Sequence, residues 1–227
     1  AWSPDGRRLA AGDAGGGLWL WDGEGDRHLA GRLAEPGGSA ARPRTGLNPT
    51  EQPPAAAGRG AEVIALAWSP DGQTLAVAGR DRSLRLWQAG AGKARALALV
   101  EPGTSGMAPV IALAWGPDGR TLAGATLDRQ ILLWDTARRQ LLAGPLRGHR
   151  DTITALFFDP PGRVLSSVGI DGELWRWDVD FDSWRERACR LSGRDLGAEE
   201  RRLFLIDAAG PPLCPAERPA AARRMHS

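Results

Sequence analysis

Histidine and cysteine are the side chains of this protein best suited to metal binding or to acid–base chemistry, and the chain has few of them. The three histidines are His28, His149 and His226, and the two cysteines are Cys189 and Cys214. Their positions do not follow the close spacing with which His and Cys bind structural zinc. His149 could serve as a metal ligand or a general base, but no second histidine lies near it in the sequence. We therefore expect no metal site and no cofactor.

Motifs for phosphate chemistry are also missing from the sequence. Residues 1–227 contain no G-x-x-x-x-G-K-[ST] phosphate loop and no kinase catalytic signature. The net charge of +2 is too small to indicate nucleic-acid binding, which needs clustered Lys and Arg. An arginine-rich nucleic-acid-binding surface is therefore retained only as an alternative.

The two cysteines, both near the C-terminal end, give an indication of the cellular compartment of the protein. We expect reduced thiols in a cytoplasmic protein, with a disulfide as the alternative. No run of 18 or more apolar residues occurs, so the sequence predicts no membrane-spanning helix.

The elements that would position any functional side chain come from an internal repeat. Four similar units begin with an aromatic residue at Trp2, Trp68, Trp115 and Phe158. The steps between these residues are 66, 47 and 43. A period of about 40 to 45 residues is typical of a four-stranded propeller blade, and only the first step needs an insertion. The units are Ala1–Asp22, Ala65–Gln88, Ala112–Asp135 and Ala155–Asp178.

Each unit predicts short strands separated by tight turns. In the second unit an apolar inner strand over 63–68 is followed by Pro70-Asp71-Gly72, whose residue types suit a turn. A second strand over 74–78, a polar turn over 80–82 and an alternating third strand over 84–87 complete the unit. Segments such as 94–100 and 140–146 are expected to supply the outermost strand.

Each unit ends in Trp-Asp or a close variant, so the chain resembles the WD-repeat family of β-propellers over about three quarters of its length. The resemblance implies an all-β fold: a partial β-propeller of about four four-stranded antiparallel blades with a short helical C-terminal tail. The closing dipeptides are Trp21-Asp22, Trp87-Gln88, Trp134-Asp135 and Trp177-Asp178.

In this family a His, a Ser or Thr, an Asp and the closing Trp form a hydrogen-bond network across the blade. Only the fourth unit carries all four residues, namely His149, Ser167, Asp171 and Trp177. The resemblance therefore implies a structural role for His149. The remaining repeat residues with an implied structural role are Trp21, Trp68, Asp81, Trp87, Trp115, Asp128 and Trp134.

Loops on one side of the repeats are rich in arginine. The topology implied by the resemblance places a Pro- and Gly-rich insertion, residues 34–60, on the same side as Arg80, Arg82, Arg129 and Arg150. This face could bind an acidic protein partner. The alternative is a tolerated flexible insertion beside solvated arginines.

The tail after the repeats has helical spacing, with apolar residues at 184, 188 and 191. Asp182 or Ser183 could cap the helix, and Gly193 could end it. We expect blades over 1–178, a helical tail over 179–205 with a second short helix from 199, and a mostly disordered C-terminus over 206–227. The tail is similar to that of bacterial WD-repeat signalling proteins in Trp184, Ala188-Cys189-Arg190, Gly193-Arg194 and Cys214-Pro215, but departs from it at Gly197 and Arg201.

These patterns favour a non-catalytic protein–protein interaction scaffold or sensor in a larger bacterial signalling protein. Because Ala1 begins partway through an inner strand, we expect upstream blades and an effector domain, such as a STAND-type NTPase or a kinase, in the same polypeptide. The alternative is a propeller hydrolase with a site in the central channel. That chemistry needs Asp, Glu or His on the inner strands, which these strands lack.

Overall fold

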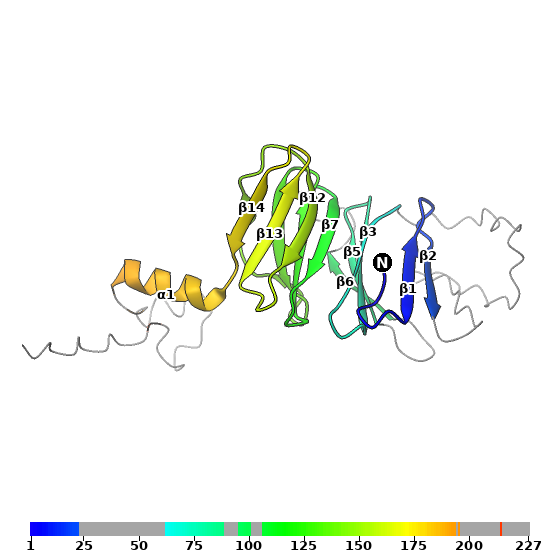
Figure 1. The fold of residues 1–227 in the computed structure, drawn as a ribbon, viewed down its shortest axis with the longest axis horizontal. Helices are drawn as coiled ribbons and strands as arrows, with labels where there is room; N and C mark the ends of the chain where they lie inside the picture. Colours follow the sequence, from blue (N-terminus) through cyan, green and yellow to red (C-terminus); the bar gives the residue numbers. More distant parts are fainter. Residues whose placement is uncertain (23–61, 89–94, 101–105, 194, 196–213, 215–227) are drawn as a thin grey trace, which may run out of the picture. The chain divides into compact units, whose positions relative to one another are not determined.

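In the described part of the chain, four antiparallel β-sheets are followed by one helix. The computed structural model describes residues 1–22, 62–88, 95–100, 106–193, 195 and 214 (Figure 1). The predicted all-β class is confirmed. We call the sheets blades 1 to 4 in chain order.

Blades 1 and 2 differ in the number of described strands. Blade 1 pairs β1 with β2, and an isolated bridge joins Trp2 to Leu9. Blade 2 has four strands in the order β3-β4-β5-β6, which confirms the predicted outermost strand. The bounds are β1 Arg8–Gly12, β2 Leu18–Asp22, β3 Val63–Trp68, β4 Thr74–Gly79, β5 Leu84–Gln88 and β6 Arg95–Val100.

Blades 3 and 4 repeat the order of inner, second and third strand. In blade 3 the predicted outer strand is two short pieces, β10 and β11, both paired with β9. Blade 4 has three strands. The bounds are β7 Val110–Trp115, β8 Thr121–Thr126, β9 Gln130–Asp135, β10 Gln140–Leu141, β11 Leu146–Arg147, β12 Ile153–Phe158, β13 Val164–Gly169 and β14 Leu174–Asp178.

The turn between the first two strands of a blade forms as its sequence predicts. Gly72 adopts φ 66°, a left-handed conformation that residues with a Cβ disfavour. The carboxylate of Asp71 accepts hydrogen bonds from the Ser69 hydroxyl at 2.5 Å and from the Gln73 amide at 2.9 Å. These bonds lower the pKa of Asp71, the serine bond most strongly. Gly6, Gly119 and Gly162 have the same left-handed conformation in the other blades.

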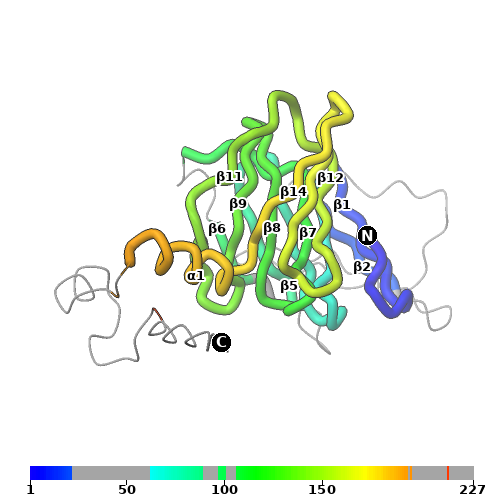
Figure 2. Tube along the Cα trace, turned by 60° about the vertical axis from the view of Figure 1, so that its left-hand side comes forward, coloured from blue at the N-terminus to red at the C-terminus, as the bar shows by residue number. Residues whose placement is uncertain are grey.

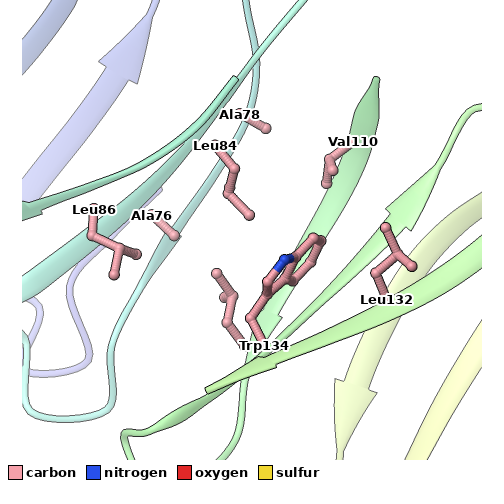
Figure 3. Close-up of a cluster of buried hydrophobic side chains, with 8 residues drawn as sticks. Ala76, Ala78, Leu84, Leu86, Val110, Leu132 and Trp134 are labelled. Carbon is pink, nitrogen blue, oxygen red and sulfur yellow. The ribbon is translucent and has the colours of Figure 1, made fainter. Parts of the chain in front are cut away.

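Successive blades pack face to face. Because side chains alternate between the two faces of a strand, each blade has an N-side face toward the preceding blade and a C-side face toward the next. The C-side face of blade 2 packs on the N-side face of blade 3, and Figure 3 shows Trp134 in this core. In Figure 2, β12 of blade 4 and β7 of blade 3 lie in neighbouring sheets that contact each other. The core residues between blades 2 and 3 are Ala76, Ala78, Leu84, Leu86, Val110, Leu122, Leu132 and Trp134.

A tryptophan at the end of the inner strand links each of two blades to the one before it. Trp68 Nε1 donates to the carbonyl oxygen of Ala1 at 3.1 Å, and Trp115 Nε1 donates to that of Ala67 at 2.9 Å. Ala1 and Ala67 each directly precede the equivalent tryptophan of their own blade, Trp2 and Trp68. The blades therefore stack in one repeated register.

The blades and the tail are two compact units, residues 1–177 and 178–227. In the second unit, α1 (Phe181–Ser192) ends at Gly193, which has φ 63° and donates to the Cys189 carbonyl at 3.0 Å. The predicted N-cap is wrong. Asp180 caps the helix because its backbone is extended and its carboxylate accepts from the Asp182 amide at 3.0 Å. Ser183 instead donates to Asp178.

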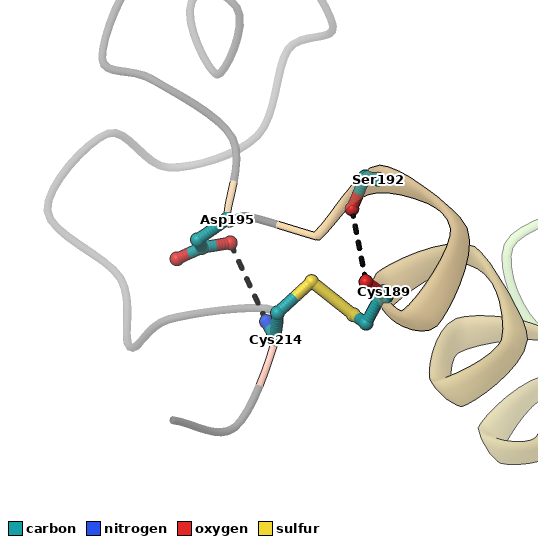
Figure 4. The surroundings of a disulfide bond; sticks show 4 residues. All are labelled: Cys189, Ser192, Asp195 and Cys214. Carbon is teal, nitrogen blue, oxygen red and sulfur yellow. Dashed lines mark hydrogen bonds between the residues drawn. A yellow bond between two sulfur atoms is a disulfide. The ribbon is translucent and has the colours of Figure 1, made fainter. Parts of the chain in front are cut away.

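The prediction of reduced thiols is also wrong, because Cys189 and Cys214 form a disulfide (Figure 4). Their Cα atoms are 5.4 Å apart, although 25 positions separate them in the sequence. The Cys214 amide donates to Asp195 at 3.4 Å. The structure thus brings the chain after α1 back to its last turn, a return that spacing alone could not predict.

Several predicted segments lie outside the described residues: the insertion 34–60, the second tail helix and most of the C-terminus over 206–227. Within the described part of the chain, α1 is the one helix, and it is too short and too polar to span a membrane.

Candidate functional site

The turn between the second and third strands of a blade is held against the segment that precedes the inner strand. In blade 2 the Arg80 amide donates to the Glu62 carbonyl at 2.8 Å. The same bond joins Leu127 to Pro109 in blade 3 and Ile170 to Thr152 in blade 4, both at 2.9 Å. These loops therefore lie at one end of their blades, and the four predicted arginines lie on them.

We call Arg80, Arg82, Arg129 and Arg150 the arginine rim. All four are exposed. Arg82 and Arg129 have φ 70° and 67°, so each occupies the left-handed position of its turn. Arg129 donates to the Arg150 carbonyl at 3.2 Å, which joins the loops of blades 3 and 4.

The rim is not uniformly basic, because nearby carboxylates take part in its loops. Arg80 pairs with Glu62, which raises the pKa of the guanidinium. Asp81 accepts from the Ser83 amide at 3.0 Å, and Asp128 accepts from the Thr126 hydroxyl. Two of the predicted repeat aspartates therefore hold the turns in shape, which keeps the rim arginines exposed at defined positions.

Blade 4 brings three of the four predicted network residues into direct contact. His149 Nε2 lies 2.6 Å from the Ser167 hydroxyl, which also accepts a hydrogen bond from Trp177 Nε1 at 2.8 Å. Ser167 is fully buried, and His149 is 7% exposed. The network therefore joins β13 and β14 to the segment before β12.

The fourth network residue, Asp171, makes no hydrogen bond to His149. Its carboxylate accepts from the Glu173 amide at 3.0 Å, and His149 Nδ1 is buried without a hydrogen-bond partner. One ligand atom from each of His149, Asp171 and Glu173 lies within 4.8 Å of the others. An imidazole and two carboxylates can bind a divalent metal ion. Here both acidic residues are exposed, and Glu173 already accepts from Trp175 Nε1 at 3.0 Å.

Blade 2 lacks the network, and its closing tryptophan shows the consequence. Val77 pairs with Leu66 as Ser167 pairs with Leu156, so a valine occupies the serine position. Trp87 Nε1 is buried without a hydrogen-bond partner. Trp87 therefore stabilises blade 2 through packing alone.

An ion pair in blade 3 was not predicted from the sequence. Asp135, the aspartate of the closing Trp-Asp, is 3% exposed and accepts from Arg120 Nη2 at 2.7 Å and from the Arg138 amide at 2.9 Å. The Arg120 hydrogen bond holds the pKa of Asp135 below its usual range. Comparing the repeats could have found this pair, because the positions of Arg120 and Asp135 change together in blade 2, where both hold glutamine, Gln73 and Gln88.

Comparison with known families identifies the repeat. The family model described as "WD domain, G-beta repeat" matches residues 1–22, 56–88, 102–135 and 140–178, more than half of the chain. The chain belongs to the WD40 family. A search of curated proteins found no match.

WD40 repeats generally mediate protein–protein interactions, and the family is typically non-enzymatic. The inner strands of blades 2 to 4 read VIALAW in β3, VIALAW in β7 and ITALFF in β12.

Proposed function

We propose that this chain is a non-catalytic interaction module that binds an acidic segment of a protein partner at the arginine rim. The observation that carries the proposal is the pair of arginines at the left-handed positions of equivalent turns, Arg82 and Arg129. Both are exposed, and each turn is tied by a backbone hydrogen bond to the loop before its inner strand. Two cations on rigid neighbouring turns can bind two carboxylates without first being ordered.

The experiment measures binding of a fluorescent peptide of alternating Asp and Ser by anisotropy, with an Asn and Ser peptide as the neutral control. We expect binding that weakens as salt is raised, because exposed charges are screened. The double variant R82E/R129E should lose at least tenfold in affinity.

Arg139→Glu is the matched control, because Arg139 is also exposed and has φ 56°, but lies on the turn between β9 and β10 at the other end of the blade. Equal loss in this variant would contradict the proposal, as would equal binding of the neutral peptide. Salt-sensitive retention on heparin without peptide binding would favour the nucleic-acid alternative.

We further propose that the module is the scaffold or sensor of a larger bacterial signalling protein. The resemblance of the tail supports this proposal. Reading the encoding DNA in frame upstream of the Ala1 codon tests it. Further Trp-Asp repeats preceded by an NTPase or kinase motif would support the proposal, and a start codon immediately before Ala1 would contradict it.

A cytoplasmic location belongs to the same proposal. Fractionating the source cells and probing each fraction with an antibody against this chain tests it. Recovery of the chain in the cytoplasmic fraction would support the proposal, and recovery outside that fraction would contradict it.

A further inference from the structure

A buried ring nitrogen of blade 4 has no partner, although two carboxylates lie close to its imidazole. His149 Nδ1 is buried and makes no hydrogen bond. In either tautomer this is unfavourable, because Nδ1 is then a buried donor or a buried acceptor without a partner. One ligand atom from each of His149, Asp171 and Glu173 lies within 4.8 Å of the others. Because Nε2 already contacts Ser167, Nδ1 is the nitrogen left for a further partner.

The space beside this nitrogen is open because Gly169 has no side chain. A Cβ at Gly169 would overlap Asp171 Oδ1 and would lie 3.2 Å from His149 Nδ1. Both ligand atoms therefore face the position that a Cβ would fill. Blade 3 has Thr126 at the equivalent position, the end of its second strand, so the repeated backbone accepts a Cβ there.

The turn between β13 and β14 is more acidic than the equivalent turns of blades 2 and 3. It has glycine at the left-handed position that holds arginine in those blades, and glutamate where they have serine or glutamine. The three turns read Asp81-Arg82-Ser83, Asp128-Arg129-Gln130 and Asp171-Gly172-Glu173. Two carboxylates without a cation in their turn repel each other, and a bound cation would relieve this repulsion.

The buried hydrogen bonds of the network hold the histidine ring in place. His149 Nε2 lies 2.6 Å from the Ser167 hydroxyl, which also accepts from Trp177 Nε1. An ion at Nδ1 requires the tautomer with its proton on Nε2. This tautomer also fits the network, because the serine oxygen has two lone pairs and can accept from both rings. Histidines that bind metal ions usually donate their other ring N–H in this way.

Glu173 can bind an ion without losing its present hydrogen bond. Its Oε2 accepts from Trp175 Nε1 at 3.0 Å, and a carboxylate has about four lone-pair sites in all. Zinc bonds of about 2.0–2.2 Å place tetrahedral ligand atoms about 3.4 Å apart. Because Asp171 and Glu173 are exposed, small rotations of their side chains can close the cluster to this size.

We propose that His149 Nδ1, Asp171 and Glu173 bind one Zn²⁺ ion at the end of blade 4 that carries the arginine rim. These three ligands leave the fourth position of a tetrahedral site to water. An imidazole nitrogen favours zinc over Mg²⁺ and Ca²⁺, which prefer oxygen ligands. The ligands come from blade 4 and the segment just before it, so the site forms within one repeat. The spacing of histidines and cysteines alone predicted no metal site, because the two carboxylates join His149 only in the folded blade.

Isothermal titration calorimetry of Zn²⁺ into the 227-residue chain tests the proposal. The disulfide is kept intact, because free cysteines also bind zinc. Glu173→Gln should weaken Zn²⁺ binding at least about tenfold, since losing even an outer partner of a metal ligand costs about that much affinity. The glutamine oxygen can still accept from Trp175 Nε1, so the variant keeps the contacts of the turn.

Glu186→Gln is the matched control, because it makes the same chemical change at an exposed position of α1. We expect this variant to bind Zn²⁺ like the unchanged chain. An equal loss of affinity in the control would overturn the proposal. So would an unchanged chain that binds no Zn²⁺, or a Glu173→Gln chain that binds it with full affinity.

Gly169→Ala tests the open space separately, because it keeps all three ligands and fills the gap between them. It should also weaken Zn²⁺ binding at least about tenfold. Circular dichroism without zinc shows whether the variant is folded, and Glu173→Gln decides alone if it is not. A folded Gly169→Ala chain with full affinity would overturn the proposal.

Ca²⁺ tests the nitrogen ligand, because this ion binds to oxygen atoms. We expect Ca²⁺ to bind at least about tenfold more weakly than Zn²⁺ in the same titration. Equal affinities would show that the carboxylates act alone, and would overturn the assignment of His149 as a ligand.

Discussion

The Ser167 hydroxyl connects two ring nitrogen atoms that come from different parts of blade 4. It accepts from Trp177 Nε1 and lies 2.6 Å from His149 Nε2. The tautomer of His149 with its proton on Nδ1 fits both contacts, because the serine can then donate its own proton to Nε2. At the residue scale, the stability of blade 4 therefore depends on the contacts that Ser167 makes with His149 and Trp177.

Ser167→Ala should lower the free energy of unfolding by about 2–4 kcal/mol, because the buried His149 Nε2 and the half-buried Trp177 Nε1 lose their partner. Urea denaturation followed by tryptophan fluorescence measures the loss. Ser166→Ala is the control, since Ser166 is 9% exposed and equivalent positions in blades 1 to 3 hold Ala10, Ala76 and Ala123. Equal losses in both variants would rule out this account of the network.

Asp135→Asn should lower the free energy of unfolding at pH 7 by about 1–2 kcal/mol, since the charge-assisted bonds to Arg120 weaken. The folded pKa of Asp135 is depressed below its unfolded value of about 3.9. Its contribution is therefore fully present above pH of about 4 and is lost as pH falls through the folded pKa.

Urea midpoints measured from pH 7 to pH 2 check this linkage. The gap between the unchanged chain and Asp135→Asn should close in acid. Asp151→Asn, at an exposed position, should leave the midpoint at pH 7 nearly unchanged. A gap that stays constant down to pH 2 would show that Asp135 acts through packing rather than through its charge.

At the element scale, the blades share one backbone pattern but fill equivalent positions differently. The position that holds Ser167 in blade 4 holds Val77 in blade 2 and Gly124 in blade 3. A Cβ added at Gly124 would lie 2.8 Å from a ring carbon of Trp134, so this blade has no room for a larger side chain there. Each blade is therefore stabilised by a different balance of packing and hydrogen bonding.

Val77→Thr should change the free energy of unfolding by less than about 0.5 kcal/mol, because the new hydroxyl can accept from the unpartnered Trp87 Nε1. Val110→Thr is the control: this valine is 4% exposed in the core between blades 2 and 3. An unpartnered hydroxyl there should cost about 1–3 kcal/mol. Thermal unfolding compares the two, and similar costs would count against a new bond to Trp87.

At the scale of the whole molecule, blades and tail are separate compact units with different stabilising interactions. The unit over 1–177 is held together by apolar cores between adjacent sheets. The unit over 178–227 has a capped helix and the Cys189–Cys214 disulfide. The disulfide therefore constrains the tail without crossing into the blades.

Reduction with dithiothreitol should accelerate amide hydrogen exchange in α1 and leave exchange in β4 and β8 unchanged. A disulfide that closes a loop of this length contributes about 3 kcal/mol, mainly by constraining the unfolded chain. Mass spectrometry of peptides from each unit reads both changes in one experiment. Faster exchange in the blades would show that the tail stabilises them.

The repeat made much of the fold predictable from the sequence. The strands, the Pro-Asp-Gly turns and the helix end at Gly193 follow from patterns a few residues long, because alternation and backbone conformation are set by near neighbours. The same patterns revealed the four blades. They could not identify the helix cap, since Asp180, Asp182 and Ser183 are all suitable residue types within the same short segment.

The sequence by itself determined that this is a WD40 repeat protein and which residues stand at equivalent positions in its blades. Only the tertiary structure decided that Cys189 meets Cys214, that Arg120 pairs with Asp135 and that His149 Nδ1 lacks a partner. The reason is physical. The disulfide and the ion pair join residues that are separated in the chain. Whether these groups, or the histidine nitrogen, meet a partner depends on sheet register, loop path and side-chain rotamer, which no local pattern records.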